Sequence, residues 1–263
     1  MKMQWRRIVT AVLVLALVVG LGLFAYRQYE YHRGAASYAE AEQVAAAPAV
    51  DQPVEQPDAP DVQTPEAPAE TDPYAAALAE IDFAALRQIN DEVIGWISIP
   101  DTQVNYPVVQ AGDNEYYLDH TWKGEYNGVG AIFMEQHCAS DFSDFNTIIY
   151  GHNMRNGSMF GELRHYGDPE FLKEHPSVYL ADETGVYRYD VFAAHEVGVR
   201  TITYGLSIED EPLRQEYIDF ALSDSEVDTG VQPTTADRML VLSTCTGRGY
   251  STRWVVQAVL KQE

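Results

Sequence analysis

The chain has 263 residues, of which 46% are hydrophobic, and this is enough to build one folded domain with a substantial core. Its 40 Asp and Glu residues outnumber its 17 Lys and Arg residues, so the formal net charge is −23. Such a charge repels polyanions and argues against nucleic acid as a partner.

The N-terminal residues have the pattern of a membrane anchor. Residues 1–7 carry a basic cluster, and an uncharged stretch rich in Val and Leu follows. We predict a single transmembrane helix over residues 8–26, since about 20 apolar residues cross a bilayer. The basic flank favours a cytoplasmic N-terminus at residues 1–7, with the rest of the chain on the extracellular side of the cell membrane. A cleaved signal peptide is the alternative, although its apolar core is usually shorter and the weak cleavage candidate Ala35-Ala36-Ser37 comes late.

A linker is predicted over residues 27–74. Its first part, up to Ala47, could continue the helix of the span, and seven prolines then fall between Pro48 and Pro73 among Ala and acidic residues. A segment of this composition cannot bury enough apolar surface to order itself. Because proline and like charges extend a chain, we expect a disordered spacer that holds a domain away from the membrane.

Residues 75–263 are predicted to form the folded domain. Apolar side chains before Asn90 suit one or two short helices. Helical inserts are expected over residues 158–165, 168–173 and 207–223. Short apolar or alternating runs separated by turn residues predict strands within residues 96–99, 104–109, 130–133, 147–150, 186–195, 239–245 and 253–260. This pattern is typical of a mostly β fold, a mostly antiparallel barrel with peripheral helices.

Cys245 has the setting of an accessible nucleophile. It ends the apolar strand that begins at Met239, and the Thr246-Gly247 pair after it must leave the strand. A thiol at a strand exit is open to substrate. The other cysteine, Cys138, lacks this setting, and an oxidising exterior would also permit a disulfide between the two.

Arg253 is expected to lie close to this thiol. Seven residues separate it from Cys245, short enough for the flanking strands to pair as a hairpin with both residues near its open end. Directly opposed residues have Cβ atoms about 5 Å apart, so the guanidinium could reach the sulfur or a substrate bound to it. Its permanent charge suits stabilising a thiolate, or the oxyanion formed when that thiolate attacks an amide. Arg248 is a rival for this role, and an ordinary salt bridge is the alternative for either arginine.

His152 also follows a β-branched strand, in the run Tyr150-Gly151-His152-Asn153. Gly151 and Asn153 indicate a turn that projects the imidazole. A histidine can give a proton to a leaving amine and take one from an incoming amine. Most of the seven histidines are expected to be structural or solvated, and the strand-exit setting singles out His152.

Metal catalysis is not expected from this sequence. His137 and Cys138 are adjacent and would point to opposite sides of an extended segment, and neither C-x-x-C nor H-E-x-x-H occurs. A glycine-rich phosphate loop is also missing from the sequence. We therefore expect no metal and no organic cofactor.

Three motifs taken together resemble the sortase family: Leu242-Ser243-Thr244-Cys245, Arg253-Trp254-Val255-Val256 and Tyr150-Gly151-His152-Asn153. Class B sortases in particular are similar in Gly95-Trp96-Ile97-Ser98-Ile99-Pro100, Tyr106-Pro107-Val108-Val109-Gln110 and Asp113-Asn114-Glu115-Tyr116-Tyr117-Leu118. The resemblance runs from Asn90 to Leu260 and implies an eight-stranded sortase-type β-barrel with peripheral helices. It also implies a cysteine transpeptidase.

The resemblance implies a mechanism as well. Cys245 would attack the carbonyl of a threonine inside a C-terminal sorting signal of a surface protein and form a thioacyl enzyme, with His152 protonating the departing amine. Arg253 would hold the substrate and its oxyanion. An amino group of a peptidoglycan precursor or a pilin would then resolve the thioester.

The same resemblance implies a set of substrate contacts. Asn114, Leu118 and Ser243 would line the groove for the sorting signal. Thr246, next to the nucleophile, would offer a backbone donor to the oxyanion.

Two other functions are compatible with the sequence. A hydrolytic cysteine peptidase would use the same thiol, imidazole and oxyanion donor, with water as the acceptor. A non-catalytic surface-binding domain would instead join Cys138 and Cys245 in a disulfide. For an enzyme, both a thiolate–imidazolium pair and a neutral Cys245 and His152 pair are compatible, since burial and distance decide the pKa values.

Overall fold

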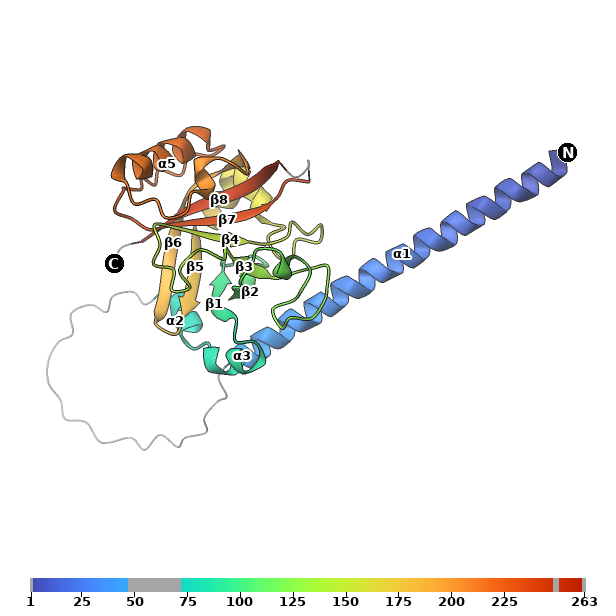
Figure 1. Cartoon of the computed structure of the whole chain (residues 1–263), viewed down its shortest axis with the longest axis horizontal. Coiled ribbons are helices and arrows are strands. Elements are labelled where there is room, and N and C mark those ends of the chain that lie inside the picture. Colours follow the sequence, from blue (N-terminus) through green and yellow to red (C-terminus); the bar gives the residue numbers. More distant parts are fainter. Residues whose placement is uncertain (1, 47–71, 248–250, 262–263) are drawn as a thin grey trace, which may run out of the picture.

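The computed structural model describes residues 2–46, 72–247 and 251–261. A long helix, α1 (Lys2–Ala45), leads to a closed barrel of strands that carries the other helices on its outside (Figure 1). The barrel has eight strands, so the expected barrel with peripheral helices is confirmed. Residues 47–71, most of the predicted linker, lie outside the described residues.

The strands close the barrel in the order β1-β2-β3-β4-β7-β8-β6-β5. Neighbours are antiparallel except for the pairs β2–β3 and β4–β7, which are parallel. The bounds are β1 (Val93–Ser98), β2 (Asn105–Val109), β3 (Ile132–Met134), β4 (Asn146–Tyr150), β5 (Ser177–Asp182), β6 (Gly185–Gly198), β7 (Met239–Cys245) and β8 (Thr252–Leu260). Only β5 was missed from the sequence. It is buried on both faces and does not alternate.

Strand β7 separates two apolar cores, and this explains its unbroken apolar run. Leu240 and Leu242 belong to the cluster inside the barrel, whereas Met239 and Val241 belong to a second cluster with the helix α5 (Glu211–Asp224). A strand covered on both faces reads as continuous rather than alternating. The strand that ends in Cys245 is therefore firmly held by packing as well as by its two neighbours.

The shorter helices begin at acidic caps. The side chains of Asp72, Asp82 and Asp168 accept backbone N–H groups at the starts of α2 (Pro73–Ala79), α3 (Phe83–Ile89) and α4 (Pro169–Glu174). Three short 3₁₀ helices also occur, η1 (Tyr116–Leu118), η2 (Leu163–Gly167) and η3 (Ile202–Tyr204).

The helix predicted over residues 158–165 starts late, at Leu163 of η2. The chain before it contains Gly157 and Met159 with φ of 86° and 56°. Positive φ values are incompatible with a right-handed helix. The other inserts are helical near their predicted positions, as α4 and α5.

The second half of α1 packs on the barrel, where the sequence had predicted a linker from residue 27. Tyr38, Ala41 and Ala45 are buried, and they follow the spacing of one helix face. Polar contacts reinforce this face, because the indole N–H of Trp122 donates to the Ser37 carbonyl oxygen at 2.9 Å. Residues 27–45 continue the helix of the apolar segment, as the sequence allowed, and the buried residues of this stretch pack with the folded domain.

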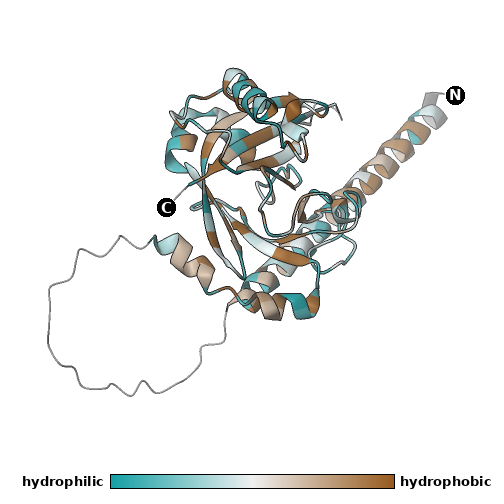
Figure 2. Ribbon diagram, turned by 60° about the vertical axis from the view of Figure 1, so that its left-hand side comes forward, coloured by the Kyte–Doolittle hydropathy of each residue, from teal (hydrophilic) through white to brown (hydrophobic). Residues whose placement is uncertain are grey.

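The first half of α1 extends away from the barrel, and much of it is hydrophobic (Figure 2). In the described residues one helix is long and apolar enough to cross a membrane, with a mean hydropathy of 2.8 over its best window and none of that window buried. A signal sequence near an N-terminus can also satisfy this criterion of length and hydropathy. An apolar surface of this size needs lipid or protein to cover it.

Candidate active site

Cys245 and Arg253 lie opposite each other at the open end of the β7–β8 hairpin. The antiparallel register pairs the two residues directly. Opposed residues have Cβ atoms about 5 Å apart, which brings the guanidinium within reach of the thiol. One nitrogen of the guanidinium, Nη1, also donates to the Thr252 carbonyl oxygen at 2.9 Å. The hairpin expected from the short spacing is thus present.

His152 reaches the same place from a different strand. β4 runs parallel to β7, with Tyr150 beside Ser243, so the chain that leaves β4 emerges next to the end of β7. The Nε2 atom of His152 lies 2.6 Å from the Leu118 carbonyl oxygen. In the tautomer with its proton on Nε2, the imidazole donates this hydrogen bond, and the contact orients the ring.

Hydrogen bonds join the segment around His152 to the end of β7. Asn153 Nδ2 donates to the Cys245 carbonyl oxygen at 2.7 Å, and Thr244 Oγ1 donates to the Gly151 carbonyl oxygen at 2.7 Å. The Gly151 N–H donates to the Ser243 carbonyl oxygen at 3.2 Å. The positions of the thiol and the imidazole are therefore coupled through the backbone on both sides.

A cavity of about 210 Å³ connects the candidate residues. It is lined by Cys245, His152 and Arg253 together with Asn114, Leu118, Phe133, Tyr150, Gly151, Ser243 and Thr244. Three of the four expected substrate contacts are therefore in its wall. The fourth, Thr246, lines a separate cavity of about 530 Å³ with Asn153 and Trp254, because the chain turns after Cys245. Arg248, the rival arginine, lies outside the described residues.

Tyr204 of η3 belongs to this region and was missed from the sequence. Its hydroxyl shares a 2.8 Å hydrogen bond with Ser243 Oγ. Burial raises the pKa of Tyr204; the Ser243 hydrogen bond and the Arg253 charge oppose that rise, and Cys245 adds to it. Because Ser243 lines the cavity, this hydrogen bond places the phenol behind the cavity wall. A tyrosine in a short turn carries no local signal for this position.

The two cysteines have different environments. Cys138 is buried, its Sγ lies 3.5 Å from the Asn146 carbonyl oxygen, and burial raises the pKa of its thiol to about 11. It is neutral at pH 7 and is not a nucleophile. Both cysteines are free thiols, so the disulfide required by the non-catalytic alternative does not form. The described residues contain no cluster of His, Cys, Asp and Glu suited to a metal ion.

Comparison with known proteins agrees with this geometry. Residues 97–261 match the sortase domain model. The chain is 36% identical over 177 residues to Sortase B of Listeria monocytogenes. This alignment covers 66% of this chain and 72% of that protein. The Staphylococcus aureus sortase B–substrate complex has a TM-score of 0.65 at 30% identity, covering 68% of this chain and 84% of that one. Sortase B of Bacillus anthracis in complex with AAEK1 has a TM-score of 0.70 at 30% identity, covering 89% and 99%.

A closed eight-stranded barrel with a cysteine at the end of β7 defines a class of cysteine transpeptidases. The chain belongs to the sortase family, and the relatives that it matches are class B sortases.

Proposed function

We propose that the chain cleaves a C-terminal sorting signal after a threonine and transfers the substrate protein to an amino group of peptidoglycan or of a pilin. The observation that supports this most directly is the convergence of Cys245, His152 and Arg253 on one cavity. A relative with the same fold, sortase B of Staphylococcus aureus, has been solved as a complex with substrate.

The first half of the reaction forms a thioester. The Cys245 thiol gives its proton to His152 and its sulfur attacks the threonine carbonyl. The negative charge that develops on the carbonyl oxygen is stabilised by the Arg253 guanidinium. His152 donates a proton to the nitrogen of the scissile amide as that bond breaks. The C-terminal part of the signal leaves as an amine, and the substrate protein remains on the sulfur.

The second half reverses these roles. An incoming amine attacks the thioester carbonyl, and His152 takes the proton that this nitrogen loses. The carbon–sulfur bond breaks, and the proton on His152 passes to the sulfur to restore the thiol of Cys245. A new amide then joins the substrate protein to its acceptor.

The cavity wall accounts for substrate binding in this proposal. Asn114, Leu118 and Ser243 contact the signal, and Asn114 and Ser243 provide polar groups beside the apolar surface of Leu118. The backbone N–H of Thr246, next to the nucleophile, donates to the oxyanion, although the residue also lines the other cavity.

Residues 8–26 anchor the protein in this proposal, with residues 1–7 in the cytoplasm and the barrel on the extracellular side. An uncovered apolar helix end and the basic cluster before it support this arrangement. The barrel, residues 75–263, and the docked half of α1 then act together at the cell surface.

The experiment is turnover of quenched sorting-signal peptides by the full-length chain in detergent micelles, with Cys245→Ala as the matched control. An amine such as triglycine is supplied or withheld. Cleavage that requires Cys245, with an amine-linked product only when the amine is present, is the expected result. Equal hydrolysis under both conditions, without an amine-linked product, would establish a peptidase instead.

A further inference from the structure

Glu135 is a buried carboxylate behind the cavity wall. It directly follows β3 and is 6% exposed. Burial by itself raises the pKa of this group, but hydrogen bonds from Asn114, His137 and Tyr150 outweigh burial and lower it below the ordinary value. Glu135 is therefore an ionised group at neutral pH. The reaction proposed above gives it no task.

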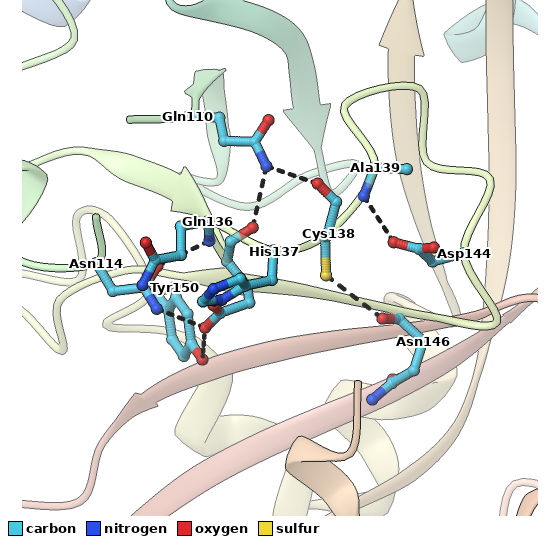
Figure 3. A network of polar contacts seen from close by, with 10 residues as sticks. Gln110, Asn114, Gln136, His137, Cys138, Ala139, Asp144, Asn146 and Tyr150 are labelled. Carbon is cyan, nitrogen blue, oxygen red and sulfur yellow. Dashed lines mark hydrogen bonds and ion pairs between the residues drawn. The ribbon is translucent and has the colours of Figure 1, made fainter. Parts of the chain in front are cut away.

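One oxygen of Glu135 receives hydrogen bonds from two cavity residues. Its Oε2 accepts from Asn114 Nδ2 at 2.6 Å and from the Tyr150 hydroxyl at 3.0 Å. Asn114 lies in the loop before η1 and Tyr150 ends β4, and Figure 3 shows both side chains gathered at the same side of the network. A single carboxylate thus ties together two parts of the wall that are distant in sequence.

The amide of Asn114 is held at both of its polar atoms. While Nδ2 donates to Glu135, Oδ1 accepts from the Gln136 backbone N–H at 2.9 Å. Rotating the amide by 180° would set its oxygen against the carboxylate and its NH₂ against a backbone donor. The side chain therefore has one orientation, with its second N–H and the second lone pair of Oδ1 left for other partners.

Tyr150 is restricted in a different way. Its hydroxyl has one proton, which it gives to Glu135, so it can only accept a hydrogen bond from a molecule in the cavity. Burial, with the nearby charge of Glu135, raises the pKa of Tyr150 and keeps the phenol neutral. Glu135 thus decides which atoms of this wall act as donors and which act as acceptors.

Glu135 is itself held from other sides. Its Oε1 lies 3.1 Å from Nδ1 of His137, whose side chain is 66% exposed. Gln110 Nε2 donates to the carbonyl oxygens of Glu135 and Cys138 at 3.0 and 2.8 Å, which fixes the backbone beneath the carboxylate (Figure 3). The network is therefore rigid, and the orientation of Asn114 is set before any ligand arrives.

We propose that Glu135 is a positioning residue for substrate binding, because it fixes the Asn114 amide and the acceptor role of Tyr150 for the amide groups of a bound peptide. The inference rests on the proposed function, since it requires that the cavity holds the sorting signal. Without Glu135, the Asn114 amide keeps only its contact with the Gln136 N–H and the Tyr150 hydroxyl proton is free to turn, so the peptide must order both groups on binding. The loss falls on KM, while the groups that carry out bond breaking are unchanged.

The test measures KM and kcat separately for the full-length chain in micelles with a cleavable sorting-signal peptide. Glu135→Ala is expected to raise KM about tenfold and to leave kcat within about twofold. Glu135→Gln can place its amide oxygen toward Asn114 and Tyr150 and its NH₂ toward His137, so its KM should stay within about threefold of wild type.

A double-mutant cycle tells positioning from general loss of structure. In an Asn114→Ala background, Glu135→Ala should raise KM by about threefold or less, because the group through which it acts is gone. Asp190→Ala is the control: this carboxylate accepts from Ser177 Oγ and Arg188 Nε at 2.8 and 2.9 Å, but it does not line the cavity. Its KM should equal that of wild type.

Several results would overturn the inference. These are an unchanged KM in Glu135→Ala, an equal rise with and without Asn114, or a loss that Glu135→Gln does not rescue. If Glu135→Ala does not fold, Glu135→Asp decides, since its shorter carboxylate withdraws from Asn114: a raised KM supports the inference and an unchanged KM refutes it. A wild-type chain that cleaves no peptide refutes the proposed function, and the inference then fails with it, whereas an active wild type isolates the role of Glu135.

Discussion

The hydroxyl of Tyr38, on α1, donates a buried 2.6 Å hydrogen bond to the carbonyl oxygen of Gly130. A Cβ atom on residue 130 would lie 2.8 Å from both His152 Cδ2 and the Leu118 carbonyl oxygen. That same carbonyl holds His152 Nε2. The helix with the apolar N-terminal half is thus linked, through one loop, to the residue proposed as the proton donor.

Removing the docked half of α1 should weaken the barrel. We expect a chain that starts at residue 72, and so keeps α2 and its Asp72 cap, to be less stable than one that starts at residue 27 by about 3 kcal/mol or more, because the contacts of Tyr38, Ala41 and Ala45 are lost. Urea unfolding of the two soluble chains measures this difference. Coincident midpoints with equal slopes would show that the docking contributes nothing to stability.

Tyr38→Phe should remove the hydrogen bond to Gly130 and keep the ring packing. We expect about 1 kcal/mol less stability and a severalfold lower kcat, since the loop behind His152 loses a fixed point. Tyr26→Phe is the matched control, because Tyr26 is 57% exposed on the same helix. The two variants are compared by thermal unfolding and peptide turnover, and identical behaviour would refute the coupling.

Gly130→Ala should damage the site more severely. Residue 130 has φ of 66°, which costs an alanine about 1 kcal/mol, and the new methyl group would press on the His152 ring. We predict a drop in kcat of at least about tenfold with the chain still folded at 25 °C. Gly112→Ala, where a Cβ meets nothing within 4 Å, should keep full turnover. An active Gly130→Ala enzyme would mean that the imidazole tolerates displacement.

The two thiols should differ in reactivity. Iodoacetamide at pH 7 should alkylate Cys245, which lines the cavity, and leave Cys138 unmodified, because burial raises the Cys138 pKa to about 11. Peptide mapping by mass spectrometry identifies the modified residue. Cys138→Ala should retain turnover, and modification of Cys138 in the folded chain at pH 7 would contradict this account.

His195 should make the barrel sensitive to acid. In the described structure neither ring nitrogen of this buried imidazole has a hydrogen-bond partner, and burial lowers its pKa below 6.5, with Asp224 of α5 opposing that shift. Below pH 6.5, His195 binds a proton more readily in the unfolded chain than in the folded chain. The free energy of unfolding therefore falls as the pH drops below 6.5. Urea unfolding from pH 7.5 to 5 should show this slope, and His195→Leu should flatten it. Equal slopes for the two chains would assign the acid sensitivity to other groups.

Local sequence was sufficient to place the residues that sit at strand ends. β7 has the predicted bounds, and Cys245 faces Arg253 as the short spacing required, because a hairpin is decided by neighbouring residues. The same reasoning put His152 just after β4. An apolar run followed by glycine and polar residues marks the end of a buried strand, and side chains at such ends are accessible.

The tertiary structure alone decided which of these ends meet. His152 joins Cys245 only because β4 and β7 pair in parallel, a contact between distant segments that no local pattern specifies. Tyr204, Glu135 and the docked face of α1 reach the site through side chains packed from remote elements. Thr246, next to the nucleophile in sequence, faces another cavity since the chain turns after β7. Strand patterns are short-range, whereas a cavity is shaped by long-range packing, so the sequence by itself determined the candidate residues and the fold determined their arrangement.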